Sequence, residues 1–199
     1  PAGTRARVVF TRMTAAPRRV RDEAMTTFYM VELDFPFPDE REGFDAFYDG
    51  HISMLLSIPG FRFAQRFLAT HEARAPFMAV YELDAPEVLS SEAYTSRAGP
   101  SSVSETYRPK MLNWDRNVVT GPDIVLDVPM DTGWLTIVDR LDPDSPALPD
   151  GYSAFTPVGL DRTIAERGIR HGEGEASECP PRPGWTVRHF RPLRPRRTE

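Results

Sequence analysis

Residues 39–69, DEREGFDAFYDGHISMLLSIPGFRFAQRFLA, combine the pattern of an amphipathic helix with that of an alternating strand. At about 100° per residue, the apolar side chains of the first part fall on one face: Phe44, Phe47, Tyr48, Ile52, Leu55 and Ile58. Asp39 and Glu42 have the spacing of a capping box, and Pro59-Gly60 ends the pattern. These features predict a helix over residues 40–58.

The second part, residues 61–69, alternates between two faces as a strand does. Strands rich in aromatic and β-branched residues are also expected at 26–34, 77–83 and 112–119. Asp84 is placed to cap a second helix over 86–97. The resulting β-α-β-β-α-β order predicts an α+β fold with a ferredoxin-like unit. Two helices cover one face of such a sheet, so the other face needs a second sheet, from a partner chain or from the rest of this chain.

The C-terminal half supplies material for a reduced second α+β unit. We expect strands at 133–141, 151–158 and 184–193 and a short helix near 161–168, joined by long loops. The predicted organisation of the chain has four parts: 1–24, a poorly ordered extension or non-native start; 25–120, the ferredoxin-like unit; 121–193, the second unit; and 194–199, a basic tail. Met25 is the expected natural start, because the strand-like texture begins there.

Charge and composition exclude several classes of protein. Of 24 basic side chains, half lie in residues 1–24 and 181–199, which leaves a strongly acidic body that disfavours nucleic acid. No apolar run approaches the roughly 20 residues of a membrane span. Cys179 is the only cysteine, so no intrachain disulfide is possible. We therefore expect a cytoplasmic protein whose partner is a small molecule rather than nucleic acid or a membrane.

Two motifs together resemble a known family. They are FDAFYDGHISMLLSIPGFRFAQRF, residues 44–67, and APFMAVYELDAPEVLSSEAY, residues 75–94. The pattern resembles the EthD-like branch of the dimeric α+β barrel proteins over residues 26–119. The resemblance implies a homodimer or a barrel closed within one chain, with pockets between helices and sheet. Relatives in that superfamily include monooxygenases, polyketide cyclases, muconolactone isomerases and haem-binding enzymes, and many use no cofactor.

His51 is the main candidate for catalysis. It lies near the centre of the apolar helix face, within about 20° of Phe44 and Leu55. In a hydrophobic pocket, burial lowers the pKa of an imidazole and keeps a neutral base available at pH 7. In the alternative structural interpretation, the ring hydrogen-bonds a backbone carbonyl or a carboxylate and fills the core. Tyr48 precedes His51 by three residues on the same face and could donate a hydrogen bond to a substrate oxygen.

Five further residues are expected to bind substrate. Phe47 and Leu55 share the helix face, while Arg66, Tyr81 and Trp114 come from three predicted strands. Arg66 could hold an enolate or a carboxylate, or it could form a surface ion pair. Tyr81 and Trp114 are expected as lining.

The sequence contains no short metal-ligand spacing, phosphate-binding loop or hydrolase elbow, so we expect neither a metal nor a cofactor. The first hypothesis is an enzyme that catalyses cyclisation, isomerisation or dehydration by proton transfer. Its substrate would be a hydrophobic, oxygen-bearing molecule such as a polyketide or an aromatic catabolite. The alternatives are a cofactor-independent monooxygenase, a haem-dependent one with His51 or His71 as axial ligand, and a non-catalytic binding protein.

Overall fold

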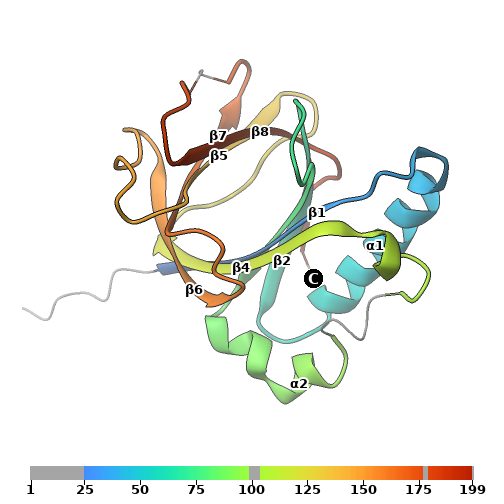
Figure 1. Ribbon diagram of the computed structural model, residues 1–199. Coiled ribbons are helices and arrows are strands. Elements are labelled where there is room, and N and C mark those ends of the chain that lie inside the picture. Colours follow the sequence, from blue (N-terminus) through green and yellow to red (C-terminus); the bar gives the residue numbers. More distant parts are fainter. Residues whose placement is uncertain (1–24, 99–103, 177–178, 199) are drawn as a thin grey trace, which may run out of the picture.

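The computed structural model describes residues 25–98, 104–176 and 179–198. Within these ranges, antiparallel strands from both halves of the chain close into one barrel (Figure 1). The order around the barrel is β1-β4-β6-β7-β5-β8-β2-β3, and β3 pairs again with β1. The strand bounds are β1 Met25–Asp34, β2 Phe61–Ala69, β3 Phe77–Leu83, β4 Leu112–Pro122, β5 Gly133–Arg140, β6 Ser153–Leu160, β7 Glu166–Glu173 and β8 Trp185–Pro192. A short β9, Arg197–Thr198, pairs with β2.

The predicted fold class is wrong. The protein is not a ferredoxin-like β-α-β-β-α-β unit joined to a reduced second α+β unit, because eight antiparallel strands form a single closed barrel. Among the described residues, α1 (Arg41–Leu56) is the one long helix. The other helical segments are short: η1 Pro38–Glu40, η2 Pro86–Ser90, α2 Glu92–Thr95 and η4 Arg108–Lys110.

Two local errors explain the wrong class. The expected helix over 86–97 is reduced to η2 and α2. The chain is interrupted at Ser91, which is extended and starts α2 as a new N-cap by accepting a hydrogen bond from the Tyr94 amide. The expected helix near 161–168 is a turn followed by β7, in which Arg167 and Ile169 are both buried. With that extra strand the C-terminal half completes the barrel, and no partner chain is needed for closure.

β1 and β3 are buried on both faces, so they separate two large cores. The inner core fills the barrel with aromatic and aliphatic side chains that alternate along the strands: Phe28, Met30, Phe63, Phe67, Met78, Val80, Val119, Leu135, Ile137, Phe155, Ile169 and Phe190 among others. The outer core lies between the barrel wall and α1, with Tyr29, Val31, Leu33, Ala79 and Tyr81 facing the apolar side of the helix. Burial on both faces explains why β1 and β3 are almost continuously apolar.

α1 packs against the outside of the barrel beside β2 (Figure 1). Its predicted apolar face is buried, but the expected cap is not formed: η1 precedes the helix, and the residue at the N-cap, Glu40, makes no side-chain capping bond. A buried ion pair fixes the helix, because Arg66 Nη2 on β2 donates to Asp45 Oδ1 at 2.7 Å. On the same helix, Asp49 accepts from Arg194 Nε at 3.0 Å.

Only part of the predicted domain organisation lies within the described residues. The extension at 1–24 lies outside the described residues. Residues 194–198, expected as a basic tail, include β9 and hold α1 through two further contacts, in which Arg197 donates to the backbone oxygen of Asp49 and to Ser53 Oγ. The C-terminal segment therefore forms part of the packing around the helix.

Two glycines of α1 give a matched test of this packing. At Gly50 an added Cβ would meet no atom within 4 Å, so we expect Gly50→Ala to stabilise the protein by about 0.5–1 kcal/mol. At Gly43 an added Cβ would collide with the Tyr107 hydroxyl, so Gly43→Ala should lose this gain. Guanidinium unfolding of both variants measures the difference. Equal stabilisation by the two substitutions would contradict the observed position of Tyr107 against the helix.

Candidate functional site

A small cavity lies between α1 and the outer face of the barrel wall. Its volume is about 30 Å³, and its lining is Tyr29, Val31, Leu33, Phe47, Tyr48, His51, Leu55, Tyr81, Met111 and Trp114. We call it the outer cavity. Six of the residues assigned to a site from the sequence meet here: Phe47, Tyr48, His51, Leu55, Tyr81 and Trp114. In this conformation the cavity has room for about two water molecules.

His51 lies half-buried on the cavity side of α1. Its ring stacks near Phe47, with the centroids 6.0 Å apart, and meets Tyr48 edge-on at 6.1 Å. Burial lowers the pKa of His51 below its ordinary value of 6.5, so the neutral imidazole dominates at pH 7. Among the described residues nothing hydrogen-bonds to this ring, and the structural interpretation, which requires such a partner, gains no support.

The outer cavity also contains buried polar hydrogens without a well-formed hydrogen bond, although the Tyr81 hydroxyl interacts with that of Tyr48. Within the described part of the chain, the buried hydroxyl of Tyr81 and the buried indole nitrogen of Trp114 make no hydrogen bond of ordinary length. Burial, together with the neighbouring Tyr48 and Tyr29, raises the pKa of Tyr81 well above 10, so its hydroxyl remains a proton donor. Because buried donors are normally paired, each of these two groups is available to an acceptor oxygen that enters the cavity.

Arg66 does not line the outer cavity. Its guanidinium lies 4.4 Å from the centroid of the Tyr48 ring, and it is paired with Asp45 as described above. Arg66 is 2% exposed, so its charge is buried rather than at the surface. It contributes to the site by holding Tyr48 and α1 in place.

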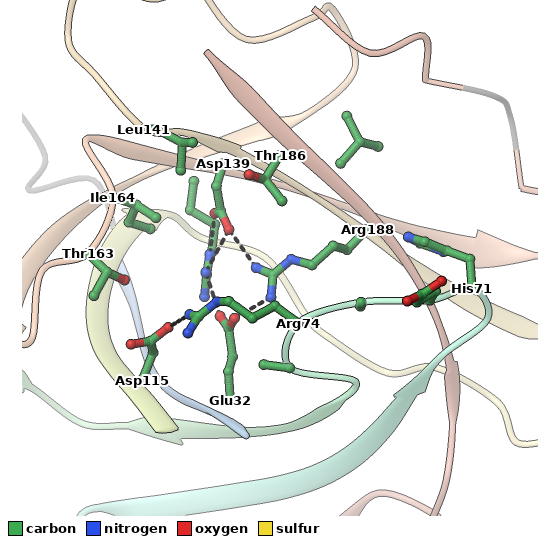
Figure 2. A pocket seen from close by; sticks show the side chains of 15 residues that line it. Glu32, His71, Arg74, Asp115, Asp139, Leu141, Thr163, Ile164, Thr186 and Arg188 are labelled. Atoms are coloured by element: carbon green, nitrogen blue, oxygen red, sulfur yellow. Dashed lines mark hydrogen bonds and ion pairs between the residues drawn. The ribbon is translucent and has the colours of Figure 1, made fainter. Parts of the chain in front are cut away.

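A second and larger cavity opens at one end of the barrel. Its volume is about 490 Å³, and we call it the barrel mouth (Figure 2). The lining comes from strand ends and from the connections β2–β3 and β6–β7: Glu32, His71, Glu72, Ala73, Arg74, Ala75, Asp115, Asp139, Leu141, Thr163, Ile164, Arg167, Thr186, Val187 and Arg188. At the rim, Arg74 forms an ion pair with Asp115.

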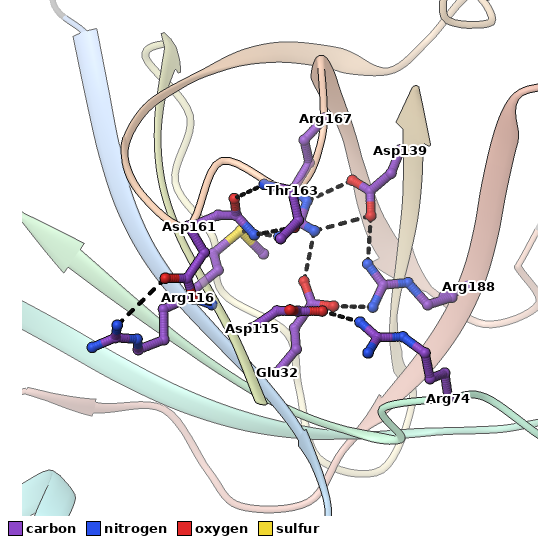
Figure 3. Close-up of polar contacts among 11 residues, drawn as sticks. Glu32, Arg74, Asp115, Arg116, Asp139, Asp161, Thr163, Arg167 and Arg188 are labelled. Carbon is purple, nitrogen blue, oxygen red and sulfur yellow. Dashed lines mark hydrogen bonds and ion pairs between the residues drawn. The ribbon is translucent and has the colours of Figure 1, made fainter. Parts of the chain in front are cut away.

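Four buried charges form the floor of the barrel mouth (Figure 3). Arg167 binds Asp139 through Nε at 2.7 Å and Nη2 at 2.9 Å, and its Nη2 also donates to Glu32 Oε1 at 2.6 Å. Arg188 donates to Asp139 Oδ2 at 2.5 Å and pairs with the second oxygen of Glu32. Each arginine thus contacts both carboxylates. We call this set the charge ring.

The charge ring controls the protonation of its members. Burial alone would raise the pKa of Glu32, but the two arginines outweigh it and hold the pKa at about 2. The carboxylates in turn raise the pKa of Arg167 and Arg188, against the opposing effect of burial. Glu32, Arg167 and Arg188 are therefore charged near neutral pH.

The charge ring was not predicted from the sequence. Its members are separated by up to 156 positions, so no local motif announces them. A signal was present nevertheless: Glu32 and Asp139 continue the inward alternation of Phe28 and Met30 on β1 and of Leu135 and Ile137 on β5. A charged residue at an inward position of a buried strand requires a buried partner.

The remaining histidines do not join the outer cavity. His71 lines the barrel mouth, and its ring centroid lies 5.8 Å from that of His189. The Nδ1 atom of His189 is 2.9 Å from Thr136 Oγ1. His171 is on β7. In the ranges that the structure describes, no three histidine, cysteine or acidic side chains gather as metal ligands, and no helix has the length and apolar character needed to cross a membrane.

Comparison with known proteins gives a likeness of fold. No family model and no curated protein sequence matches the chain. A crystal structure of an anthrone oxidase-like protein has a TM-score of 0.53 at 7% identity, over 89% of this chain and 94% of that one. This likeness is one of fold, and nothing in it supports the EthD-like branch to which the sequence resemblance pointed.

Two further crystal structures have lower TM-scores against this chain. A proposed monooxygenase from Fusobacterium nucleatum has a TM-score of 0.48 at 8% identity, covering 85% of this chain and 92% of that one. A proposed monooxygenase from Lactobacillus acidophilus has a TM-score of 0.45 at 8% identity, covering 84% and 94%.

The charge ring predicts a loss of stability in acid. Because the pKa of Glu32 is lower in the folded protein than in the unfolded chain, its contribution is complete above about pH 4.5 and is lost as pH falls towards 2. Urea midpoints measured from pH 6 to 2.5 should fall, and Glu32→Gln should flatten this decline while lowering stability at pH 7 by about 3–5 kcal/mol. The exposed Glu72→Gln is the control. A variant of Glu32 with wild-type stability at pH 7 would contradict the pairing.

Proposed function

We propose that the protein is a small-molecule enzyme that transfers a proton on a neutral, apolar ketone or related oxygen-bearing substrate in the outer cavity. The observation that supports this most is the combination of a neutral His51, without a hydrogen-bond partner among the described residues, and two buried donors, on Tyr81 and Trp114, that make no hydrogen bond of ordinary length there. A base and an oxyanion-binding pair are the two components that removal of a proton next to a carbonyl requires.

The roles follow from the protonation states. The substrate carbonyl oxygen would accept from the Tyr81 hydroxyl and the Trp114 indole N–H. His51 would take the proton from the adjacent carbon, so that the C–H electron pair moves into the enolate and its oxygen becomes negative. The imidazolium then returns the proton to another carbon, which completes an isomerisation, or to a departing hydroxyl, which completes a dehydration. Tyr48, whose pKa is raised by burial, remains a neutral phenol beside the base.

Entry of a substrate requires an opening, because the cavity now measures about 30 Å³. The groups that can yield are the partly buried ones on its outer side, Phe47 and Met111. Tyr107, also partly buried, packs on Phe47 with ring centroids 5.3 Å apart. The proposed movement therefore involves side chains and the segment around residues 104–111 rather than the barrel.

Proton abstraction can be tested without the natural substrate. Cyclohexanone, 2-tetralone and anthrone are neutral and carry CH₂ groups acidified by a carbonyl; anthrone is included because of the anthrone oxidase-like fold relative. In D₂O we expect the protein to accelerate deuterium exchange at these carbons for at least one ketone. His51→Asn should slow it by about 10²-fold or more, and Tyr81→Phe by about 10²-fold. NMR integration of the CH₂ signals measures the rate.

His171→Asn is the matched control, since His171 is a half-buried histidine on β7 that does not line the outer cavity. This variant should catalyse deuterium exchange at the wild-type rate. If His51→Asn retains the wild-type rate, the assignment of the base is wrong. If a ketone binds in the cavity without any accelerated exchange, the protein is a binding protein and not this enzyme.

The pH profile gives an independent test. The base must be neutral, and burial places its pKa below 6.5. The exchange rate should therefore fall to half of its alkaline plateau only below pH 6.5. A rate that is already half lost above pH 6.5 would contradict a desolvated His51 as the base.

A further inference from the structure

The barrel mouth is separate from the outer cavity, although both are built on β1. Val31 and Leu33 point outward and line the outer cavity, whereas Glu32 between them points inward to the floor of the barrel mouth. The mouth, at about 490 Å³, lies within the range of roughly 300–1,000 Å³ that is typical of sites for small molecules. The inside of an eight-stranded barrel can hold one small ligand.

The charges of the barrel mouth disfavour a charged ligand. Its lining carries three arginines and four carboxylates, so the formal sum with neutral histidines is close to zero. On the floor, both carboxylates are already bound by both arginines. An added anion or cation would have to displace a buried partner, and an unpaired buried charge is costly.

The floor nevertheless retains hydrogen-bond donors. Arg188 is 7% exposed, and its Nε–H, which is buried, has no acceptor among the described residues. Figure 2 shows the Arg188 side chain reaching across the cavity towards Glu32 and Asp139, with Thr186 on the same strand beside it. The carboxylate oxygens of Glu32 and Asp139 already accept from the two arginines. The hydrogen-bonding group that remains unpaired among the described residues of the floor is therefore a donor, Arg188 Nε–H.

The wall above this floor is apolar. Aliphatic side chains on several segments form it: Ala73, Ala75, Leu141, Ile164 and Val187. A ligand would thus meet donors at one end and hydrocarbon along its sides. Leu141 is 53% exposed and stands at the opening, where it can contact a bound molecule.

We infer that the barrel mouth is a second binding site, for a small neutral molecule that directs a carbonyl or amide oxygen to Arg188 Nε and lays an apolar body against Leu141, Ile164 and Val187. The site takes no part in the proposed chemistry at His51, because the barrel wall separates the two cavities. The charge ring positions the donor: it holds the guanidinium of Arg188 by its two terminal nitrogens and leaves Nε–H without an acceptor in the described part of the chain. Because Nε is buried in the unliganded structure, the ligand oxygen reaches it only when the side chains that cover it move aside.

Three compounds of nearly equal shape test the ligand class: benzamide is neutral, benzoate is an anion and benzylamine is a cation at pH 7. Titrations are followed in ¹H–¹⁵N spectra, where arginine Nε–Hε groups give their own signals. We expect benzamide to shift the Arg188 Nε–Hε signal saturably, with a Kd on the order of 1 mM. Benzoate and benzylamine should bind about tenfold more weakly or not at all.

Two tryptophan variants serve as a matched pair. Leu141→Trp should obstruct the opening and abolish the benzamide shift, while Val125→Trp, which adds the same ring at an exposed position outside the cavity, should preserve it. The Arg188 signal of the unliganded variants reports whether the charge ring is intact. Tighter binding of benzoate or benzylamine, shifts confined to the Trp114 indole, or no saturable shift with benzamide would each overturn the inference.

Discussion

Four buried charges link opposite sides of the barrel, and none of them could stay buried and paired unless the barrel is closed. Glu32 is on β1, and its partners Arg167 and Arg188 are on β7 and β8, each three strands away around the barrel in one direction or the other. The charge ring therefore crosses the interior and connects the two halves of the chain. Buried ions tolerate the loss of solvent only when all partners are in place, so the ring favours the one arrangement in which both halves meet. The apolar inner core below it supplies the bulk of the burial.

The strand-and-helix periodicities near residues 39–69 were informative because they report local burial. The bounds predicted for 61–69 and 77–83 coincide with β2 and β3, and the apolar face predicted for α1 is the buried one. The same reasoning brought Tyr48, His51 and Tyr81 to one cavity, since facing positions on a helix and an adjacent strand must meet.

The rest was not accessible from local patterns. β7, with the sequence ERGIRHGE, has few β-branched residues, and its charged Arg167 is buried through partners that are distant along the chain. Its strand character comes from pairing with β5 and β6, a long-range property. The barrel mouth was missed for the same reason, because its polar residues are collected from strand ends that only the closed topology brings together.

The three consecutive residues Val31, Glu32 and Leu33 form a partition with different chemistry on each side. A one-residue insertion or deletion in this strand would exchange the two sides, sending a carboxylate towards the helix and a hydrocarbon side chain into the ion pairs. Both chambers would be damaged by one event, so the two cannot be remodelled separately through this segment. Conversely, a ligand that displaces this part of β1 from one cavity also changes the shape of the other. The outer cavity and the barrel mouth are therefore mechanically coupled through a single strand.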